Sequence, residues 1–259
     1  GQDELLFDGD SAAVAPDGSK WFGQGSKILR YHESGWEHII IPNGMSIARH
    51  SVTQIVFGKD GDTWFSTQSG VVCFDGTTWQ RFGVEEGCTD KEIIAAIADR
   101  DGNLWFSDSG GGVYRYDGNT WTRYSVTIKN SPSRTVNSFV CDTNGTLWAG
   151  TSDGLAVFDG DAWREVPALS ETNFRDNVIK AIAADREGGI WAGTSTGSVF
   201  HLRNGEVISY TPENGVLLPV SMLTMLVDDD GVLWVANGQS GTIIPPYGLA
   251  RFDGKTWMR

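Results

Sequence analysis

The chain has 259 residues, of which 33 are acidic and 20 basic, so its formal net charge is −13. Nucleic acid and anionic lipid surfaces repel a chain this acidic, so neither is expected as a partner. Hydrophobic residues make up 40%, enough for a packed core, yet no apolar run is long enough to insert into a membrane.

A short motif recurs six times along the chain: an acidic residue or Asn, then Gly, two further residues and Trp. Its tryptophans are Trp21, Trp64, Trp105, Trp148, Trp191 and Trp234, which lie 41 or 43 residues apart. A second series follows within the same units, at Trp36, Trp79, Trp121, Trp163 and Trp257. In the fifth unit, Glu206 stands where the second Trp is expected. Repeats of this length account for the whole chain.

Each unit predicts four short strands in the same order. In the third unit, residues 93–97 are apolar on both faces, which is typical of a strand buried on both sides. Further strands are predicted at 104–106, 113–116 and 120–124. Asp-Gly pairs precede the second and fourth strands, and such pairs supply the positive φ angles that tight hairpins need.

Four short antiparallel strands every 41–43 residues are the signature of a β-propeller blade, whereas a β-solenoid normally has shorter repeats. We therefore predict an all-β fold, a six-bladed β-propeller of four-stranded antiparallel blades, in a single domain over residues 1–259. The blades are expected at about 10–41, 52–82, 93–124, 136–166, 178–210 and 222–259. Residues 4–7 are expected to pair with or pack against the sixth blade and so close the ring, because an open ring exposes a sheet edge.

The tryptophans have two readings. In a propeller, large flat side chains fill the widening gap between blades, and each buried aromatic ring contributes a few kcal/mol. Stacking on a sugar ring is the alternative. Because all eleven tryptophans fall within the repeat framework, the structural reading is preferred.

The fourth unit carries a longer pattern. It reads Asp142-Thr-Asn-Gly-Thr-Leu-Trp-Ala-Gly-Thr-Ser-Asp-Gly-Leu155 and ends in Phe158-Asp-Gly. This pattern resembles the two-component regulator propeller repeat. The resemblance implies a sensor-type β-propeller, as in the extracytoplasmic domains of bacterial hybrid two-component systems that respond to glycans. It also implies a periplasmic or secreted location. Unlike those receptors, this chain has six units and no kinase or DNA-binding region.

The recurrent Asp-Gly turns lie at one end of every blade, so a ligand is expected at the opposite end. That end carries the connections between blades and the loops between second and third strands. A basic residue recurs there in four successive units, two or three residues before the innermost strand, at Arg49, Lys91, Arg134 and Arg175. We predict a ligand site at the channel mouth formed by Arg49, His50, Lys91, Arg134, Phe174, Arg175 and Tyr247. Four cations suit a carboxylate, sulfate or phosphate.

The alternative is that these basic side chains are simply solvated, or are neutralised by Asp90 and Asp176 beside Lys91 and Arg175.

Other constellations point less clearly to a function. Clustered acids such as Asp99 and Asp101 suit calcium, but turn chemistry also explains them, and Gly58 stands at the first of these positions in the second unit. Neither a metal nor another cofactor is therefore expected. Cys73 and Cys141 are interpreted as small buried hydrophobes, and Cys88 as a loop residue that could be a free thiol. His201 is interpreted as structural, at the position of the aromatic residue in the third strand.

The leading interpretation is a non-enzymatic binding module that recognises a small-molecule or oligosaccharide ligand, acidic in character. No catalytic residues can be assembled from matching ends of the blades. A carbohydrate-active propeller enzyme, a lyase or a hydrolase, is one alternative, and a protein-interaction platform that binds a protein partner is another. A monomer is expected.

Overall fold

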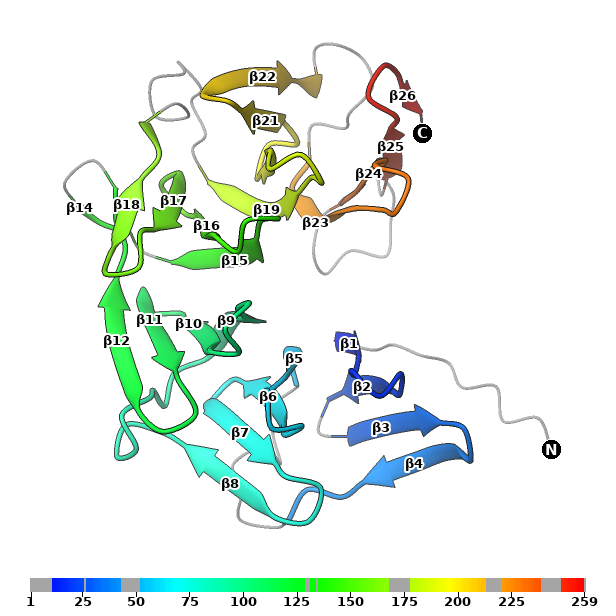
Figure 1. The fold of residues 1–259 in the computed structure, drawn as a ribbon, viewed down its shortest axis with the longest axis vertical. Helices are drawn as coiled ribbons and strands as arrows, with labels where there is room; N and C mark the ends of the chain where they lie inside the picture. The colour runs from blue at the N-terminus through cyan, green and yellow to red at the C-terminus, as the bar shows by residue number, and fades with distance from the viewer. Residues whose placement is uncertain are drawn as a thin grey trace. The chain divides into compact units, whose positions relative to one another are not determined.

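The computed structural model describes residues 11–25, 27–42, 52–128, 131–133, 135–167, 178–212, 220–238 and 248–258. Within these ranges the chain forms six four-stranded antiparallel sheets, here called the first to sixth blades, and one two-stranded hairpin (Figure 1). The chain divides into two compact units, Gly1–Tyr124 and Ser125–Arg259, which are treated separately below. None of the described segments is a helix that could span a membrane.

The first unit contains three blades, and in each the strands pair in chain order. The first blade consists of β1 (Ser11–Val14), β2 (Lys20–Gln24), β3 (Lys27–His32) and β4 (Gly35–Ile39). The second consists of β5 (Gln54–Phe57), β6 (Thr63–Thr67), β7 (Gly70–Phe74) and β8 (Trp79–Phe82). The third consists of β9 (Ile93–Ala98), β10 (Leu104–Asp108), β11 (Gly112–Tyr116) and β12 (Trp121–Ser125), whose last residue crosses the unit boundary.

The second unit begins with the hairpin of β13 (Thr127–Ile128) and β14 (Ser131–Pro132). Its first blade, the fourth of the chain, consists of β15 (Val136–Cys141), β16 (Leu147–Thr151), β17 (Leu155–Phe158) and β18 (Trp163–Glu165). The fifth consists of β19 (Ile179–Ala184), β20 (Ile190–Thr194), β21 (Val199–Arg203) and β22 (Glu206–Tyr210). The sixth consists of β23 (Met222–Val227), β24 (Leu233–Asn237), β25 (Gly248–Phe252) and β26 (Trp257–Met258).

The predicted Asp-Gly turns form as hairpins at both expected places in a blade. In the second blade, Gly61 of the first turn and Gly76 of the second have φ angles of 89° and 93°. A side chain with a Cβ is strained at such angles, so glycine is needed there. The Asp before the second turn adds hydrogen bonds, since the Asp75 carboxylate accepts from the backbone N–H groups of Thr77 and Thr78 at 2.7 and 2.6 Å.

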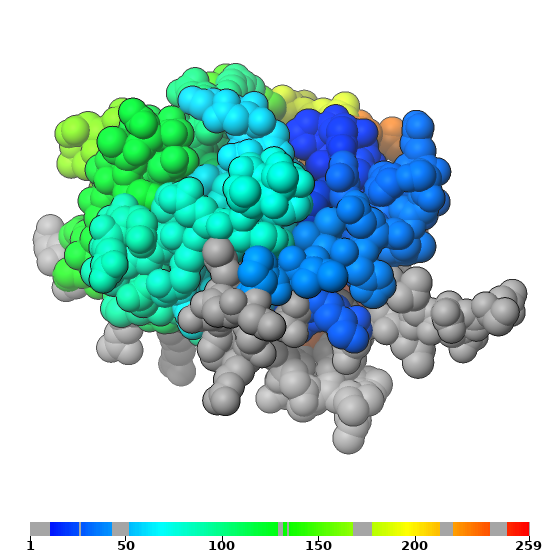
Figure 2. Space-filling view, turned by 90° about the horizontal axis from the view of Figure 1, so that it is seen from below, coloured from blue at the N-terminus to red at the C-terminus, as the bar shows by residue number. Residues whose placement is uncertain are grey.

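The hydrophobic cores lie between neighbouring blades of one unit. One cluster joins Trp21 and Ile28 of the first blade to Ile55 and Phe65 of the second. Figure 2 shows these two blades, in blue and cyan, side by side on one face of the first unit. Further clusters join the second blade to the third, the fourth to the fifth, and the fifth to the sixth. Face-to-face packing therefore stabilises each unit.

A small residue two positions after the first Trp allows the blades to approach closely. A Cβ on Gly193 would lie 2.4 Å from Cγ of Met222, in the next blade. A Cβ added to Gly150 would likewise lie 2.7 Å from Cγ2 of Ile179. Real Cβ atoms do not approach other carbon atoms so closely, so the first strand of the next blade packs directly on glycine backbone.

The predicted fold class, an all-β propeller of six four-stranded blades, is confirmed. Two details of the fifth unit were wrong. Val207, not Glu206, occupies the second Trp position, because it pairs opposite Leu202 as Trp79 pairs opposite Phe74. Leu202 is therefore the counterpart of the third-strand aromatic, and His201 lies one residue earlier. Residues 4–7 lie outside the described residues, so their role in ring closure stays a prediction.

Candidate functional site

Only one of the seven predicted site residues, Lys91, lies within the described part of the chain. The predictions for Arg49, His50, Arg134, Phe174, Arg175 and Tyr247 remain untested, because these residues lie outside it.

Lys91 lies in the connection between β8 and β9, and its side chain is exposed. Its backbone N–H donates to Oγ1 of Thr89 at 3.2 Å, and its carbonyl oxygen accepts from the N–H of Gly70 at 2.9 Å. The side chain lies across Gly110, where an added Cβ would overlap it. The backbone of Lys91 is therefore fixed beside the loop between the second and third strands of the second blade.

Asp90 does not neutralise Lys91. Its carboxylate pairs with the Arg81 guanidinium at 2.5 Å, and Arg81 also donates to the backbone oxygen of Ser69 at 3.0 Å. Within the described residues, no carboxylate oxygen lies within 4.0 Å of Nζ of Lys91. Within the described part of the chain, the ammonium group of Lys91 therefore has no carboxylate partner.

A buried carboxylate that sequence analysis missed shapes the same region. Asp108 is 1% exposed and accepts four hydrogen bonds. The donors are the N–H groups of Gly110 and Gly112 at 2.9 and 2.8 Å, the Thr89 hydroxyl at 2.9 Å and the Tyr114 hydroxyl at 3.1 Å. Burial raises the pKa of Tyr114, and the Asp108 charge adds to that effect. Asp108 thus joins the connection that carries Lys91 to the loop between β10 and β11.

Comparison of the repeat units could have identified Asp108 as unusual. Three other units have Thr at the position three residues after the first Trp, at Thr67, Thr151 and Thr194. Each of these hydroxyl groups binds backbone groups of the loop between the second and third strands. The change from Thr to Asp in the third unit marks a loop with a different anchor.

A groove recurs between neighbouring blades on the side of the Asp-Gly turns. Three such grooves are described: groove A between the first and second blades, groove B between the second and third, and groove C between the fifth and sixth. Their cavities measure about 230, 100 and 490 Å³. Each is lined by a first Trp, by the residue opposite that Trp in the third strand, and by the aromatic residue that ends the third strand of the next blade.

The first Trp of most blades donates its indole N–H to a side chain of the first turn. Nε1 of Trp105, Trp148 and Trp234 lies 2.8, 3.1 and 2.7 Å from Oδ2 of the turn aspartate, which is Asp99, Asp142 and Asp228 respectively. Indole binding therefore accounts for these aspartates, and no cluster of three metal-binding side chains occurs among the described residues. In the first blade, Oγ of Ser19 accepts the Trp21 indole hydrogen bond at 3.1 Å.

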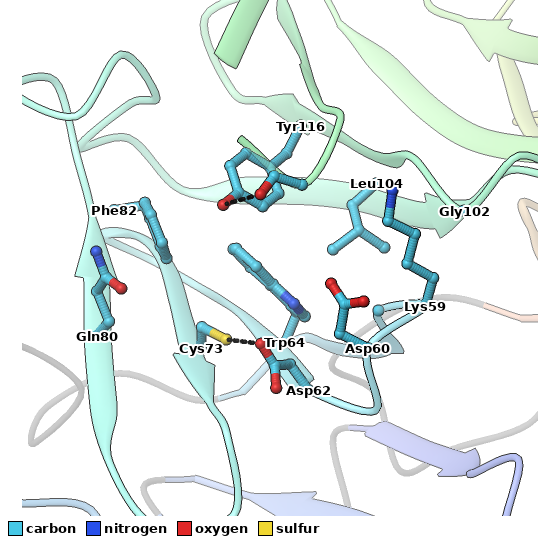
Figure 3. Close-up of a pocket in the computed structure, with 12 residues that line it drawn as sticks. Lys59, Asp60, Asp62, Trp64, Cys73, Gln80, Phe82, Gly102, Leu104 and Tyr116 are labelled. Carbon is cyan, nitrogen blue, oxygen red and sulfur yellow. Dashed lines mark hydrogen bonds between the residues drawn. The ribbon is translucent and has the colours of Figure 1, made fainter. Parts of the chain in front are cut away.

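Figure 3 shows groove B, with Trp64, Asp62 and Cys73 among the residues that line it. This groove lacks the indole acceptor, because Gly58 takes the position of the turn aspartate in the sequence. The Trp64 indole is 3% exposed and makes no hydrogen bond in the described structure. Asp62 instead lies 3.8 Å from Sγ of Cys73, which donates to it. Burial and the Asp62 charge raise the pKa of Cys73 to about 12, so its thiol stays protonated.

Cys88, the one cysteine expected in a loop, is also buried, at 5% exposure. Burial raises its pKa to about 12. It is free, as proposed, but it packs in the hydrophobic cluster between the second and third blades.

Groove C contains a histidine–aspartate pair. The His201 ring stacks on Trp191 with ring centroids 3.8 Å apart and an interplanar angle of 1°. Its Nε2 lies 2.8 Å from Oδ2 of Asp185, the turn aspartate of this blade. Burial alone would raise the pKa of Asp185, but hydrogen bonds from the Gly189 N–H and from His201 outweigh it and lower the pKa. In this blade, His201 therefore occupies the turn carboxylate that accepts the indole hydrogen bond in the third, fourth and sixth blades.

Residues 130–153 and 173–196 match the family model described as two component regulator propeller. The predicted resemblance is therefore confirmed for these two repeats. The sequence matches none of the curated proteins.

Among solved structures, the chain is similar to the extracellular domain of a putative hybrid two component system from B. thetaiotaomicron, with a TM-score of 0.71 and 20% identity. That match covers 86% of this chain and 32% of the other, so the chain spans about a third of that domain's length. A catalytically inactive virginiamycin B lyase from Staphylococcus aureus with quinupristin matches with a TM-score of 0.73 and 13% identity, over 98% of this chain and 85% of the other. A gluconolactonase from Xanthomonas campestris matches with a TM-score of 0.57 and 14% identity, over 88% and 82%. At these identities the matches support the propeller fold alone.

Proposed function

We propose that this chain is an extracytoplasmic, sensor-like β-propeller that binds a small acidic ligand or acidic glycan through the end of its blades opposite the Asp-Gly turns. The location is periplasmic or secreted. The two matched repeats and the similarity to an extracellular domain of a two-component system support this class of protein. The residues proposed to contact the ligand are those predicted at the channel mouth: Arg49, His50, Lys91, Arg134, Phe174, Arg175 and Tyr247.

The state of Lys91 carries this proposal. A basic residue near a carboxylate is ordinarily neutralised by it, and Asp90 was the obvious partner in sequence. Asp90 instead pairs with Arg81. Lys91 therefore presents a cation without a described counter-ion, in a chain whose net charge is −13. A ligand with a carboxylate, sulfate or phosphate group would pair with it.

An enzyme is the second candidate, because a lyase and a gluconolactonase share the fold. The His201–Asp185 pair is the described arrangement most like a catalytic one. However, Asp185 belongs to a first turn, at the end of the blade opposite the residues proposed to bind the ligand. Binding without turnover is therefore the preferred proposal.

Titration calorimetry with an acidic oligosaccharide, trigalacturonate, tests the proposal. We expect Lys91→Gln to weaken binding roughly 10- to 150-fold, as loss of one charged hydrogen bond worth about 1.5–3 kcal/mol does, and added salt to weaken binding further. Lys59→Gln is the matched control, because Lys59 lies beside groove B, at the Asp-Gly turn end of the blade. Recovery of the sugar unchanged supports binding without catalysis. Equal affinity of the Lys91 and Lys59 variants would contradict the proposed site.

A further inference from the structure

Groove C is much larger than the equivalent grooves. Its cavity of about 490 Å³ falls in the range of about 300–1,000 Å³ that is usual for small-molecule sites. Groove B, at about 100 Å³, has room for only a few water molecules at roughly 30 Å³ each. Because the two grooves occupy the same position in the repeat, their shared framework does not explain the size of groove C.

Among the described residues, one polar group in groove C without a hydrogen-bond partner is the indole N–H of Trp191. Trp191 is 5% exposed, it lines the cavity, and its N–H makes no hydrogen bond in the described structure. In the third, fourth and sixth blades, the turn aspartate accepts this hydrogen bond. In the fifth blade, Oδ2 of Asp185 lies against His201 instead. Nε1 of Trp191 is not among the fully buried polar atoms without a partner, so it is accessible from the groove, where a ligand oxygen can accept its hydrogen bond.

Two further side chains of groove C have unused hydrogen-bonding groups. Within the described residues, neither the Tyr210 hydroxyl nor the Asp230 carboxylate makes a side-chain hydrogen bond or ion pair. Tyr210 both donates and accepts, whereas Asp230 only accepts. The groove therefore offers Trp191 as a donor, Asp230 as an acceptor and Tyr210 as either.

The charges around groove C are otherwise paired. Arg186 binds Asp229 at 2.6 Å, and Arg203 binds Glu187. Since no arginine of the groove is left unpaired, an anion would find no free guanidinium there. The apolar walls are formed by Phe252, which is 6% exposed, and Ile208, which is 53% exposed.

From these observations we propose that groove C is a second ligand site, which binds an uncharged molecule of one or two hydroxyl-bearing rings. A hydroxyl group can accept from the Trp191 N–H and donate to the Asp230 carboxylate, which matches the unused groups. The C–H face of a saturated ring packs on Phe252 and Ile208. Groove C shares no lining residue with the site proposed above: its residues belong to the Asp-Gly turn end of the fifth and sixth blades.

Nuclear magnetic resonance of the full chain tests the proposal, with cellobiose, maltose and lactose as uncharged probes. The chain has eleven indole N–H groups, and Trp191→Phe identifies the Trp191 signal. We expect at least one probe to shift this signal at about 50 mM, well above the millimolar dissociation constants of weak complexes. The Trp64 signal of groove B is expected to stay in place.

Variants then locate the binding. Trp191→Phe and Tyr210→Phe each remove one polar group, and we expect either change to weaken binding roughly 5- to 10-fold. Tyr210→Phe keeps the ring, so it covers the case in which the Trp191 variant fails to fold. Trp64→Phe is the matched control in groove B and should leave the affinity unchanged.

Two results would overturn the proposal. One is the absence of a Trp191 shift with all three probes. The other is sugar binding that Lys91→Gln abolishes but Tyr210→Phe leaves intact. That result would place the sugar at the end of the blades opposite the Asp-Gly turns. The trigalacturonate titration tests the proposed function independently, so each proposal can fail without the other.

Discussion

The first-turn residue six positions before the first Trp shows how a single side chain controls a buried indole. Where this residue is aspartate, as in Asp99 and Asp228, its carboxylate binds both the turn backbone and the indole N–H. Where it is Gly58, the indole of Trp64 has no described acceptor. This residue is therefore one determinant of the indole hydrogen bond. In the first blade Ser19 accepts the bond instead, and in the fifth blade His201 occupies the Asp185 carboxylate.

Substitution of Gly58 by aspartate tests this role. A Cβ at Gly58 would lie 3.2 Å from Nε1 of Trp64, a close contact that a small shift of the indole relieves. We expect Gly58→Asp to raise the free energy of unfolding by about 0.5–1.5 kcal/mol, the usual worth of one hydrogen bond, in urea denaturation. Gly58→Ala is the control, because it adds the Cβ without an acceptor. Equal stability of the two variants would show that the indole does not need one.

The repeat made the framework residues predictable, but it did not reveal the polar network around Lys91. The six Trp positions and the Asp-Gly turns recur, so comparison of the units identifies them. Asp108 occurs in one unit alone, and one of its four donors, Thr89, comes from the preceding connection between blades. The pairing of Asp90 with Arg81 was likewise hidden, because nine residues separate two side chains that meet only when the blade forms.

At the scale of strands and turns, an aspartate holds the second hairpin turn in four of the six blades. Asp75, Asp117, Asp159 and Asp253 all accept hydrogen bonds from backbone N–H groups of their own turn. The hydrogen bond from the Thr78 side chain has the largest effect on the pKa of Asp75, and the backbone N–H groups of Thr78 and Thr77 add to it. Together they lower this pKa from 3.8 to about 2. The pKa values of the other three aspartates are lowered as well.

These turns predict how stability depends on pH. Because the pKa of Asp75 is lower in the folded chain than in the unfolded chain, its stabilisation is complete above about pH 4 and is lost as the pH falls towards 2. We therefore expect the midpoint of urea unfolding to fall as the pH is lowered from 4 to 2. The slope of this midpoint against pH should be smaller in the Asp75→Asn variant. Asp60→Asn, which changes an acid without a described side-chain hydrogen bond, should leave the slope unaltered. An identical slope in Asp75→Asn would contradict the assignment.

Packing between strands of neighbouring blades gives a second prediction at this scale. We expect Gly193→Ala to destabilise the protein by about 1–3 kcal/mol, because the new methyl group would overlap Cβ and Cγ of Met222. Thermal unfolding measures the change. Met222→Ala in the same chain removes Cγ, the closest of these atoms, so the double variant should be more stable than the sum of the two single effects predicts. Strict additivity would mean that the two residues do not meet.

At the scale of the whole molecule, the period of 41–43 residues predicted the number and order of the blades. In the third unit it also placed all four strands to within two residues, whereas in the fifth unit Val207, not Glu206, occupies the second Trp position. The loops at the proposed ligand end could not be predicted in this way, because they differ between units and share no motif. The regular pattern specifies the scaffold, whereas function depends on the irregular segments.

The proposal that residues 1–259 form one domain predicts a single cooperative unfolding transition. Residues 4–7 are proposed to contribute to it, so deletion of residues 1–8 should lower the melting temperature clearly. Calorimetry on the intact and shortened chains checks both points. Two separate transitions would contradict the single domain, and an unchanged melting temperature would make the N-terminal segment a loose tail.

The glycines beneath neighbouring blades also set rules for recombining this protein. Gly150 accepts Ile179, and Gly193 accepts Met222, whereas Ser66 occupies the corresponding position in the second blade and is fully buried. A chimera that placed the sixth blade after the second would bring Met222 onto a serine side chain instead of bare backbone. A chimera should therefore keep each of these glycines together with the first strand of the next blade, which packs on it. The segment to exchange then runs from the second strand of one blade to the first strand of the next, and not from one end of a blade to the other.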